Sequence, residues 1–200
     1  MKIARRTNWM LAACICLGGL MGTVIGARGT TLARMSIEQM ARSAQFVVRA
    51  HCVANSVAWD AGEIWTFTTF AVDEKWKGPD AVNPNSYVSV RLLGGTVGNL
   101  TSTVSGVPRF ASGEEVVLFL ERTARGDFSI VSWMQGTFRV RRDTRTGADI
   151  AIQDAASFET FEPSIRQFRA AGARNMQIDE LRARVAAAIS ETASHTRGEK

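Results

Sequence analysis

Only a few side chains of this chain have the types and the spacing that chemistry requires. His51 and Cys52 form the one adjacent pair that combines a base with a nucleophile, or two metal ligands. Their surroundings predict a β-strand, in which neighbouring side chains point to opposite faces, so the two cannot share a proton or a metal ion. We expect a structural pair, with one side chain buried and one exposed, because free cysteine is among the most buried residue types. The second histidine, His195, lies in a polar tail, and two histidines are too few for a metal cluster.

Two adjacent carboxylates, Glu114 and Glu115, are the next candidates, as a general acid and a general base. An enzymatic function would require both side chains in one pocket, whereas neighbours on a strand face opposite ways. Carboxylates ahead of an apolar strand are commonly gatekeepers that keep its entrance soluble, and we prefer this interpretation. Ser105-Gly106 and Ser112-Gly113 lack the flanking glycine of a nucleophile elbow. The sequence therefore predicts a protein that is not an enzyme and that has no catalytic, metal or cofactor site.

The stretch Gly94–Gly98 is similar in composition to a phosphate-binding loop, and it follows a predicted strand. Neither a helix nor the Gly-Lys-Ser/Thr ending of such loops comes after it. We interpret it as a flexible turn.

Aromatic residues offer a different kind of site, a flat face that binds a glycan or another small ligand. Its members would be Trp59, Trp65, Trp76, Trp133 and Tyr87. Small β-barrels of the OB type bind oligosaccharides and single strands on such faces. No basic stripe accompanies these residues, which favours a role in the core or at its rim.

The elements that position these residues are organised around Gly113–Leu120. Val116 to Leu120 carries no polar side chain on either face. A strand of this kind must be covered by protein on both sides. The sequence therefore predicts a central strand here.

The rest of the chain up to Arg142 has the period of shorter, half-polar strands. Ser36 and Gln39 predict the start of a helix that runs to about Ser43, with Met35 packed on Met40. Period-two alternation and turn residues then predict strands, a loop and a turn. The predicted segments are a strand at 45–53, a loop at 55–62, strands at 63–76, 87–93, 127–133 and 136–142, a turn at 143–147 and a returning strand at 149–152.

From Phe158 onward the period changes to that of helices. Phe161, Ile165 and Phe168 would share one helical face in a segment that ends at Ala171-Gly172. A second helix would bury the face formed by Ile178, Leu181, Val185 and Ile189, and the polar tail 192–200 would fray.

The segment Met1–Ala27 has the three parts of an export signal, namely a basic start, an apolar run and small residues after it. Cleavage near Ala27, after Gly26 or after Ala33, would give a secreted or periplasmic protein. The alternatives are an uncleaved membrane anchor and acylation at Cys14, where Leu11–Cys14 resembles a lipobox. The mature N-terminus stays open at this point, as do the oligomeric state and the identity of the partner.

Removal of this segment changes what the composition implies. Three of the 24 basic residues would be lost, which leaves 21 against 19 acidic residues and lowers the net charge from +5 to +2. Such a balance gives little support to nucleic-acid binding. Cys52 would be the only remaining cysteine, so an intramolecular disulfide is excluded and stability must come from the core.

Several strand ends and turns together resemble a known module. They are Ala44–Ala50, the strand end Trp76-Lys77-Gly78-Pro79, the strand Val88–Leu92 and the strand Gly113–Leu120. This pattern resembles the netrin-like module of the tissue inhibitors of metalloproteinases, over roughly residues 44–140. The resemblance implies a mainly β fold with flanking helices, a small OB-like closed β-barrel and C-terminal α-helices, with a protein partner such as an extracellular protease.

This sequence departs from the inhibitors at the residues that carry their activity. In that family an N-terminal Cys-x-Cys chelates the zinc of the protease, whereas the only Cys-x-Cys here, Cys14-Ile15-Cys16, lies inside the predicted signal. Zinc-chelating inhibition therefore cannot be assigned to any residue of this chain.

We therefore predict an exported binding module of four parts. They are a signal peptide at 1–27, an N-terminal segment with a short helix at 28–43, a netrin-like OB-type barrel at 44–154 and a C-terminal helical segment at 155–200. Polar, glycine-bearing loops between rigid strands are common binding surfaces, which directs attention to 55–62 and 94–109. The candidate binding residues are Trp59, Asp60, Gly94, Gly95, Asn99 and Arg109.

Overall fold

The computed structural model describes residues 33–79, 82–157, 159–162, 164–170, 172–173 and 175–198. The predicted signal at 1–27, with Cys14 and Cys16, lies outside the described residues. The elements follow in chain order as α2 (Ile37–Ser43), β1 (Phe46–Asp60), β2 (Glu63–Lys77), β3 (Tyr87–Leu93), β4 (Gly95–Val97), β5 (Leu100–Ser102), β6 (Glu115–Arg122), β7 (Phe128–Ile130), the 3-10 helix η1 (Trp133–Gly136), β8 (Thr137–Arg142), β9 (Asp149–Gln153), the 3-10 helix η2 (Asp154–Ser157), β10 (Glu159–Glu162), β11 (Gln167–Ala170), β12 (Met176–Gln177) and α3 (Ile178–Gly198).

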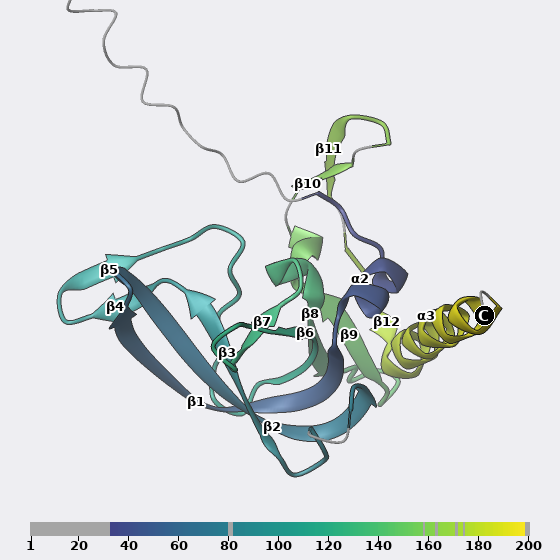
Figure 1. Cartoon of the computed structure of the whole chain (residues 1–200), viewed down its shortest axis with the longest axis horizontal. Helices are drawn as coiled ribbons and strands as arrows, with labels where there is room; N and C mark the ends of the chain where they lie inside the picture. The colour runs from purple at the N-terminus through teal and green to yellow at the C-terminus, as the bar shows by residue number, and fades with distance from the viewer. Residues whose placement is uncertain are drawn as a thin grey trace, which may run out of the picture. The chain divides into compact units, whose positions relative to one another are not determined.

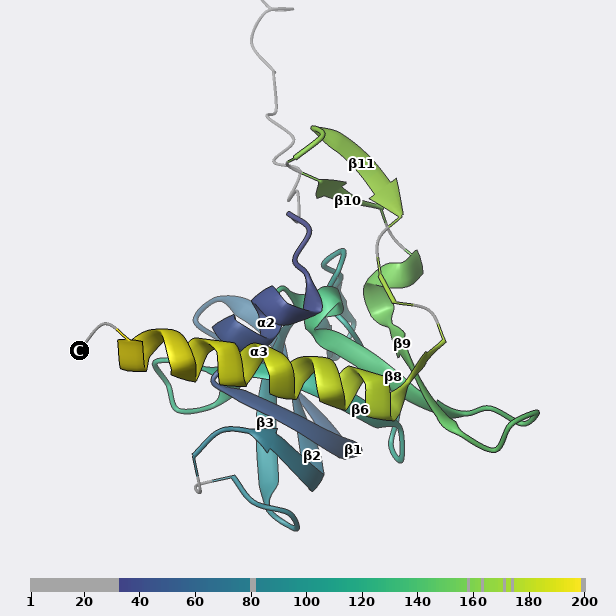
Figure 2. The same cartoon turned by 90° about the vertical axis from the view of Figure 1, so that its right-hand side faces the viewer.

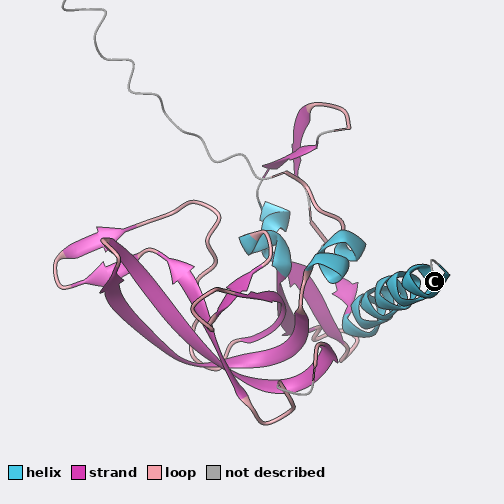
Figure 3. Ribbon diagram, in the orientation of Figure 1, coloured by secondary structure: helices cyan, strands magenta, loops and turns pink. Residues whose placement is uncertain are grey.

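Eight of the strands form one mixed sheet, which confirms the predicted mainly β fold (Figures 1 and 3). Its order is β1-β2-β3-β7-β6-β8-β9-β12. An additional pairing of β1 with β6 turns the first five of these strands into a partial ring. The single parallel contact in the ring joins Val90 of β3 to Phe128 of β7.

The predicted central strand is confirmed as β6. It pairs with β1, β7 and β8, and the side chains from Val116 to Leu120 are all fully buried. Val116, Leu118 and Leu120 face the inside of the ring, whereas Val117 and Phe119 face a second apolar layer. An apolar run without alternation is thus accounted for by a core on each side of the strand.

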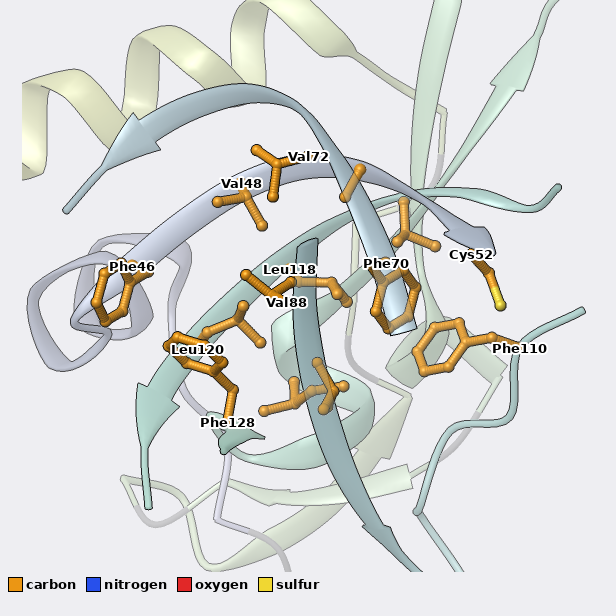
Figure 4. Packing of buried hydrophobic residues seen from close by; sticks show 14 of the residues in the cluster. Phe46, Val48, Cys52, Phe70, Val72, Val88, Phe110, Leu118, Leu120 and Phe128 are labelled. Carbon is orange, nitrogen blue, oxygen red and sulfur yellow. The ribbon is translucent and has the colours of Figure 1, made fainter. Parts of the chain in front are cut away.

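The ring core is built from inward-facing side chains of five strands, from Val82 between β2 and β3, and from the loop before β6. At one end Phe46 meets Phe128 edge to face, with ring centroids 5.1 Å apart, and at the other Phe70 meets Phe110 in the same way at 4.9 Å. Figure 4 shows Leu120 beside the first pair and Cys52 beside the second. The predicted alternation of β2 and β3 is confirmed, because alternate residues from Ile64 to Val72 and from Val88 to Leu92 are buried.

Helices α2 and α3 cover the other face of the sheet (Figure 2). Leu181, Val185 and Ala188 of α3 are buried in the same layer as Val117 and Phe138. This confirms the predicted face of the C-terminal helix. The tail that we expected to fray continues the helix to Gly198, and residues 199–200 lie outside the described residues.

Helix α2 begins and ends as the sequence predicts. Ser36 and Gln39 form a reciprocal capping box, and Met35 packs against the layer that contains Met40. At the C-terminal end, Lys77 Nζ donates to the carbonyl oxygens of Ala41 and Ala44 at 2.7 and 2.6 Å. An ammonium group at this end also interacts favourably with the helix dipole.

The predicted loop at 55–62 is wrong, because β1 runs on to Asp60. Only Ala61 and Gly62 form the turn into β2, and both have positive φ, 51° and 83°. Such a two-residue turn suits the right-handed twist of a hairpin. The polar residues Asn55 and Ser56 concealed the strand because they pair with β2 outside the core.

The predicted helix around Phe161 and Phe168 is also wrong. These residues belong to the hairpin β10–β11, in which they lie directly opposite each other with ring centroids 5.4 Å apart. A spacing of seven residues places two side chains on one helical face, but it also aligns them across a hairpin with a four-residue connection. The predicted strand 127–133 is shorter in the structure, because β7 ends at Ile130 and Trp133 begins η1.

Candidate functional site

The far end of the β1–β2 hairpin differs from the rest of the sheet, and we refer to it as the hairpin lobe. It consists of Val53–Asp60 of β1, the facing residues Glu63–Thr69 of β2 and the small hairpin β4–β5. β6 pairs with β1 only up to His51, because the chain enters β6 at Glu115. Beyond this point β1 loses one of its two neighbours, and every residue from Val53 to Trp59 is exposed.

The large apolar side chains that are exposed to solvent are concentrated in the lobe. Val53, Val57 and Trp59 of β1 are 42%, 37% and 52% exposed, and Leu100 of β5 is 54% exposed. The described residues hold three other exposed large hydrophobic side chains, which lie outside the lobe on β3 and around β11: Tyr87, Ile165 and Phe168. Exposed apolar groups that gather in one place, unlike scattered ones, mark interaction sites.

The register of the hairpin shows which side chains share a face. Trp59 lies opposite Ile64 and Val57 lies opposite Thr66, so all four point to one side. β4 lies over this side at Gly95, where an added Cβ atom would be 2.6 Å from Val57 Cγ1 and 2.7 Å from Thr66 Oγ1. Only glycine allows so close an approach. Figure 1 shows β4 and β5 beside the far ends of β1 and β2.

A buried threonine of β2 binds the chain directly before the small hairpin, and an arginine binds the end of β3 next to it. Thr66 Oγ1 donates to the carbonyl oxygen of Gly94 at 2.7 Å, and Gly94 N donates to Ile64 O at 2.7 Å. Arg109 Nη2 donates to Leu93 O at 2.9 Å. Burial lowers the pKa of Arg109. Gly94, Gly95 and Arg109 therefore build the lobe, and the predicted flexible turn at 94–98 is wrong because it forms β4 and the turn after it.

Asp60 points to the opposite face of the hairpin. It binds Arg91 of β3 and Arg125 of the loop after β6, and hydrogen bonds from these two groups lower the pKa of its carboxyl. The guanidinium of Arg91 lies 4.0 Å from the centre of the Trp65 ring. Asp60 thus ties the lobe to the sheet and takes no part in the apolar face.

All six predicted binding residues lie in the lobe or next to it, and Asp60 points to the face opposite to Trp59. Trp59 and Asn99 are exposed, the latter in the turn between β4 and β5, while Gly94, Gly95 and Arg109 support them. Sequence reasoning missed Val57 and Leu100. The spacing of Val57 and Trp59, two apart in a run without charge, was the available signal for Val57; nothing in the sequence distinguishes Leu100 from a core residue.

The other aromatic residues do not join Trp59 in one face. Trp65 lies on the opposite side of the hairpin, with its ring nitrogen buried and without a hydrogen-bond partner. The guanidinium carbon of Arg182 in α3 lies 5.2 Å from the centre of the Trp76 ring, and Trp133 is half-buried in η1. Tyr87, the first residue of β3, is 67% exposed.

The two pairs that suggested catalysis are separated as expected. Cys52 is buried in the ring core, whereas His51 is partly exposed and contacts Asp73 Oδ1 at 3.0 Å. Burial raises the pKa of the Cys52 thiol, which makes it a poor nucleophile. Glu115 binds Arg49 and Glu114 binds Arg139, so the two carboxylates do not share a pocket.

Two arginines that the sequence did not single out hold the entrance of β6. Besides Glu115, Arg49 binds Asp149 at 2.9 Å and Glu74 at 3.4 Å. Arg139 binds Asp154 at 2.6 Å together with Glu114. Burial by itself would raise the pKa of Glu114, but the hydrogen bonds from Arg139 and from the Ala111 amide outweigh burial and lower it.

A cavity of about 630 Å³ lies at the start of α2, next to η1 and η2. Its polar side chains are already engaged with one another, with the backbone or, for Arg184, with Glu38. Gln135, for example, donates to Ala33 O and accepts from Met35 N, each at 2.8 Å, and Gln153 donates to Gln135 O at 2.5 Å. The other polar side chains around it are Arg34, Ser36, Gln39, Glu162, Ser164 and Arg184. The cavity therefore offers fewer groups to a ligand than the lobe does.

Neither ligating clusters nor membrane spans appear in the described ranges. No three side chains of the metal-binding types histidine, cysteine, aspartate and glutamate come together there, and none of the helices there is both long and apolar enough to cross a bilayer. Comparison with protein-family models finds no family that matches the chain, and comparison with curated proteins finds no similar protein. Function must therefore be inferred from the residues and the geometry described above.

Proposed function

We propose that the protein is an exported, non-enzymatic binding module with a barrel of the OB type, and that it binds a protein partner through the hairpin lobe. The barrel is supported by the ring of pairings β1-β2-β3-β7-β6 that returns to β1, since five strands are the complement of an OB barrel. The core inside this ring gives the lobe a rigid base.

The observation that carries the proposal is the exposed apolar surface of the lobe. Val57, Trp59 and Leu100 are exposed beside β4, which Gly95 and Thr66 hold in place. Tryptophan is enriched among the residues that dominate binding energies, above all where apolar neighbours exclude water around it. Contact of apolar side chains with water is unfavourable in the free protein, and a partner that covers them removes this contact. The strands of the lobe hold these side chains in place for such a partner.

The non-enzymatic part of the proposal is supported by the state of the polar groups. Glu114, Glu115 and Asp60 each bind arginine, and Cys52 lies inside the core. Groups that are saturated by permanent partners of the fold are poor general acids, bases or nucleophiles.

Capture from the exported fraction tests the proposal. Immobilised protein, the double variant Trp59→Ser/Leu100→Ser and the control Tyr87→Ser would be compared under identical conditions. We expect wild type and control to retain the same partner and the double variant to lose it, because Tyr87 is, among the described residues, the most exposed aromatic residue outside the lobe. The resemblance of the strand ends to the inhibitor module makes an extracellular protease the first purified partner to test.

Two outcomes would contradict protein binding by the lobe. One is capture that the double variant leaves unchanged, which would move the binding surface elsewhere. The other is quenching of tryptophan fluorescence by cell-wall fragments that Trp59→Ala abolishes while no protein is captured, which would favour the alternative function of a glycan or small-ligand module.

A further inference from the structure

One edge of β1 is unoccupied in the lobe. β1 pairs with β2 along its other edge as far as Asp60. On the free side β6 pairs as far as His51, and the loop before β6 continues with bonds from Gly113 N to Cys52 O at 2.7 Å and from Ser112 Oγ to Val53 O at 3.2 Å. From Ser56 to Asp60, no strand of the described residues pairs with this edge.

This edge lacks the features with which proteins prevent strands from pairing between molecules. Natural edge strands are protected by charged side chains, prolines, bulges or a covering element. From Val53 to Trp59 the sequence has neither charge nor proline, and the irregularity in the register lies between Cys52 and Ala54, before the free segment. The first charge, Asp60, is held by Arg91 and Arg125.

We propose that Ser56–Asp60 pairs antiparallel with the same segment of a second copy of this chain, with the twofold axis at Ala58. In this register Val57 of each copy lies opposite Trp59 of the other, and the two Ala58 residues lie opposite each other. An aromatic side chain opposite a β-branched one is a favourable cross-strand pair. No charge meets a like charge, because the one ionised residue, Asp60, lies opposite Ser56.

The self-complementarity of this segment is the reason to expect a second copy of the chain at the free edge. A twofold axis requires a surface that matches itself, and five residues with one aromatic, one β-branched and one small central position meet that requirement. The pairing would join the β3-β2-β1 sheets of two copies into one and set two lobes side by side. The pairing goes beyond the proposed function because it needs the backbone edge of β1. Val57 and Trp59 belong to both surfaces, and Ala58, which lies on the opposite face, separates the two in an experiment.

Substitution at Ala58 tests the proposal. Ala58 is exposed and lies on the face opposite to Val57 and Trp59, so its replacement leaves the apolar face intact. Ala58→Lys and Ala58→Glu would each place like charges opposite each other at the axis, whereas an equimolar mixture would place opposite charges there. Sedimentation equilibrium at low ionic strength would be run on wild type, each variant and the mixture.

We expect a dimer of the wild type, a dissociation constant about tenfold higher for each variant alone and recovery in the mixture. Hydrogen exchange checks the location, because those amides of residues 56–60 that point to the free edge would be protected at high concentration in wild type but not in Ala58→Lys. Circular dichroism would verify that the variants are folded. A wild type that stays monomeric, or a dimer that both substitutions leave unchanged, overturns the proposal.

Discussion

The two halves of β1 belong to one strand but have different surroundings. Phe46–Cys52 is paired on both edges, by β2 and by β6, and its side chains enter the two cores of the molecule. Val53–Asp60 is paired on one edge only, and its valines and tryptophan are exposed. Composition does not distinguish them, because both halves contain β-branched and aromatic residues.

The two halves differ because only the inner half has a strand on its second edge. β6 can cover β1 only from Glu115 onward, because the chain turns at Gly113, with φ 79°, to enter it. Apolar residues in the inner half therefore contribute to folding, whereas those in the outer half are available for binding. The inner half, which is packed in the two cores, fixes the position of the outer half, in the same way as a rigid scaffold fixes the position of a binding loop.

The largest expected effect tests this comparison directly. Phe46→Ala, in the inner half, removes a buried ring that contacts Phe128, and we expect it to lower the free energy of unfolding by about 3–5 kcal/mol. Trp59→Ala, in the outer half, removes a side chain that is 52% exposed and pairs across the hairpin with Ile64, and it should lower the free energy of unfolding by no more than about 1 kcal/mol. Urea unfolding measures both. Similar losses would show that Trp59 is a core residue and would break the comparison.

A smaller effect is expected within the lobe. Gly95→Val would bring a side chain against Val57 and Thr66 at a backbone φ of 145°, which L residues rarely adopt, and should cost about 1–3 kcal/mol. Hydrogen exchange should show faster opening of β4 and β5. Gly98→Asn is the matched control, because Gly98 has φ 61° and open space around it, and asparagine tolerates this conformation. Equal effects of the two substitutions would argue against close packing at Gly95.

The smallest effect concerns the boundary between the two halves, where Glu114 accepts from Cys52 N at 2.9 Å through its carbonyl and binds Arg139 through its carboxylate. The folded state lowers the pKa of Glu114 below its ordinary value of 4.5, so its contribution to stability is complete above that pH and is lost as pH falls through the folded-state pKa. Between pH 7 and acid, wild type should lose about 1 kcal/mol more than Glu114→Gln. Parallel curves for the two proteins in chemical unfolding would exclude this contribution.

Sequence reasoning succeeded where one local rule governed a segment. The box of Ser36 and Gln39 starts α2, the alternation from Ile64 to Val72 has one buried face, and the opposite facing of His51 and Cys52 holds in the structure. It failed where two structures satisfy the same pattern. Phe161 and Phe168 fit a helical face and a hairpin equally well, and only pairing with a neighbouring strand decides between them.

The candidate site shows the same division. Trp59, Gly94, Gly95, Asn99 and Arg109 were predicted as parts of two loops. In the structure Trp59 belongs to β1 and Gly95 to β4, and the residues meet because β4 lies over the β1–β2 hairpin. Leu100 and Val57 were missed because exposure of an apolar residue is a property of its neighbours. Asp60 was predicted as a binding residue in the loop 55–62, but it ends β1 and binds arginines from segments 31 and 65 residues away.

The sequence by itself determined the central strand β6, the amphipathic faces of β2, β3 and α3, and the separation of the pairs His51-Cys52 and Glu114-Glu115. These features follow from the period of a single element, which needs no partner to be recognised. The tertiary structure decided how far β1 extends, which of its halves is covered, and which arginines neutralise Asp60, Glu114 and Glu115. Pairing and burial between distant segments depend on the whole chain, and for this protein they determine which apolar residues form the core and which form the surface for a partner.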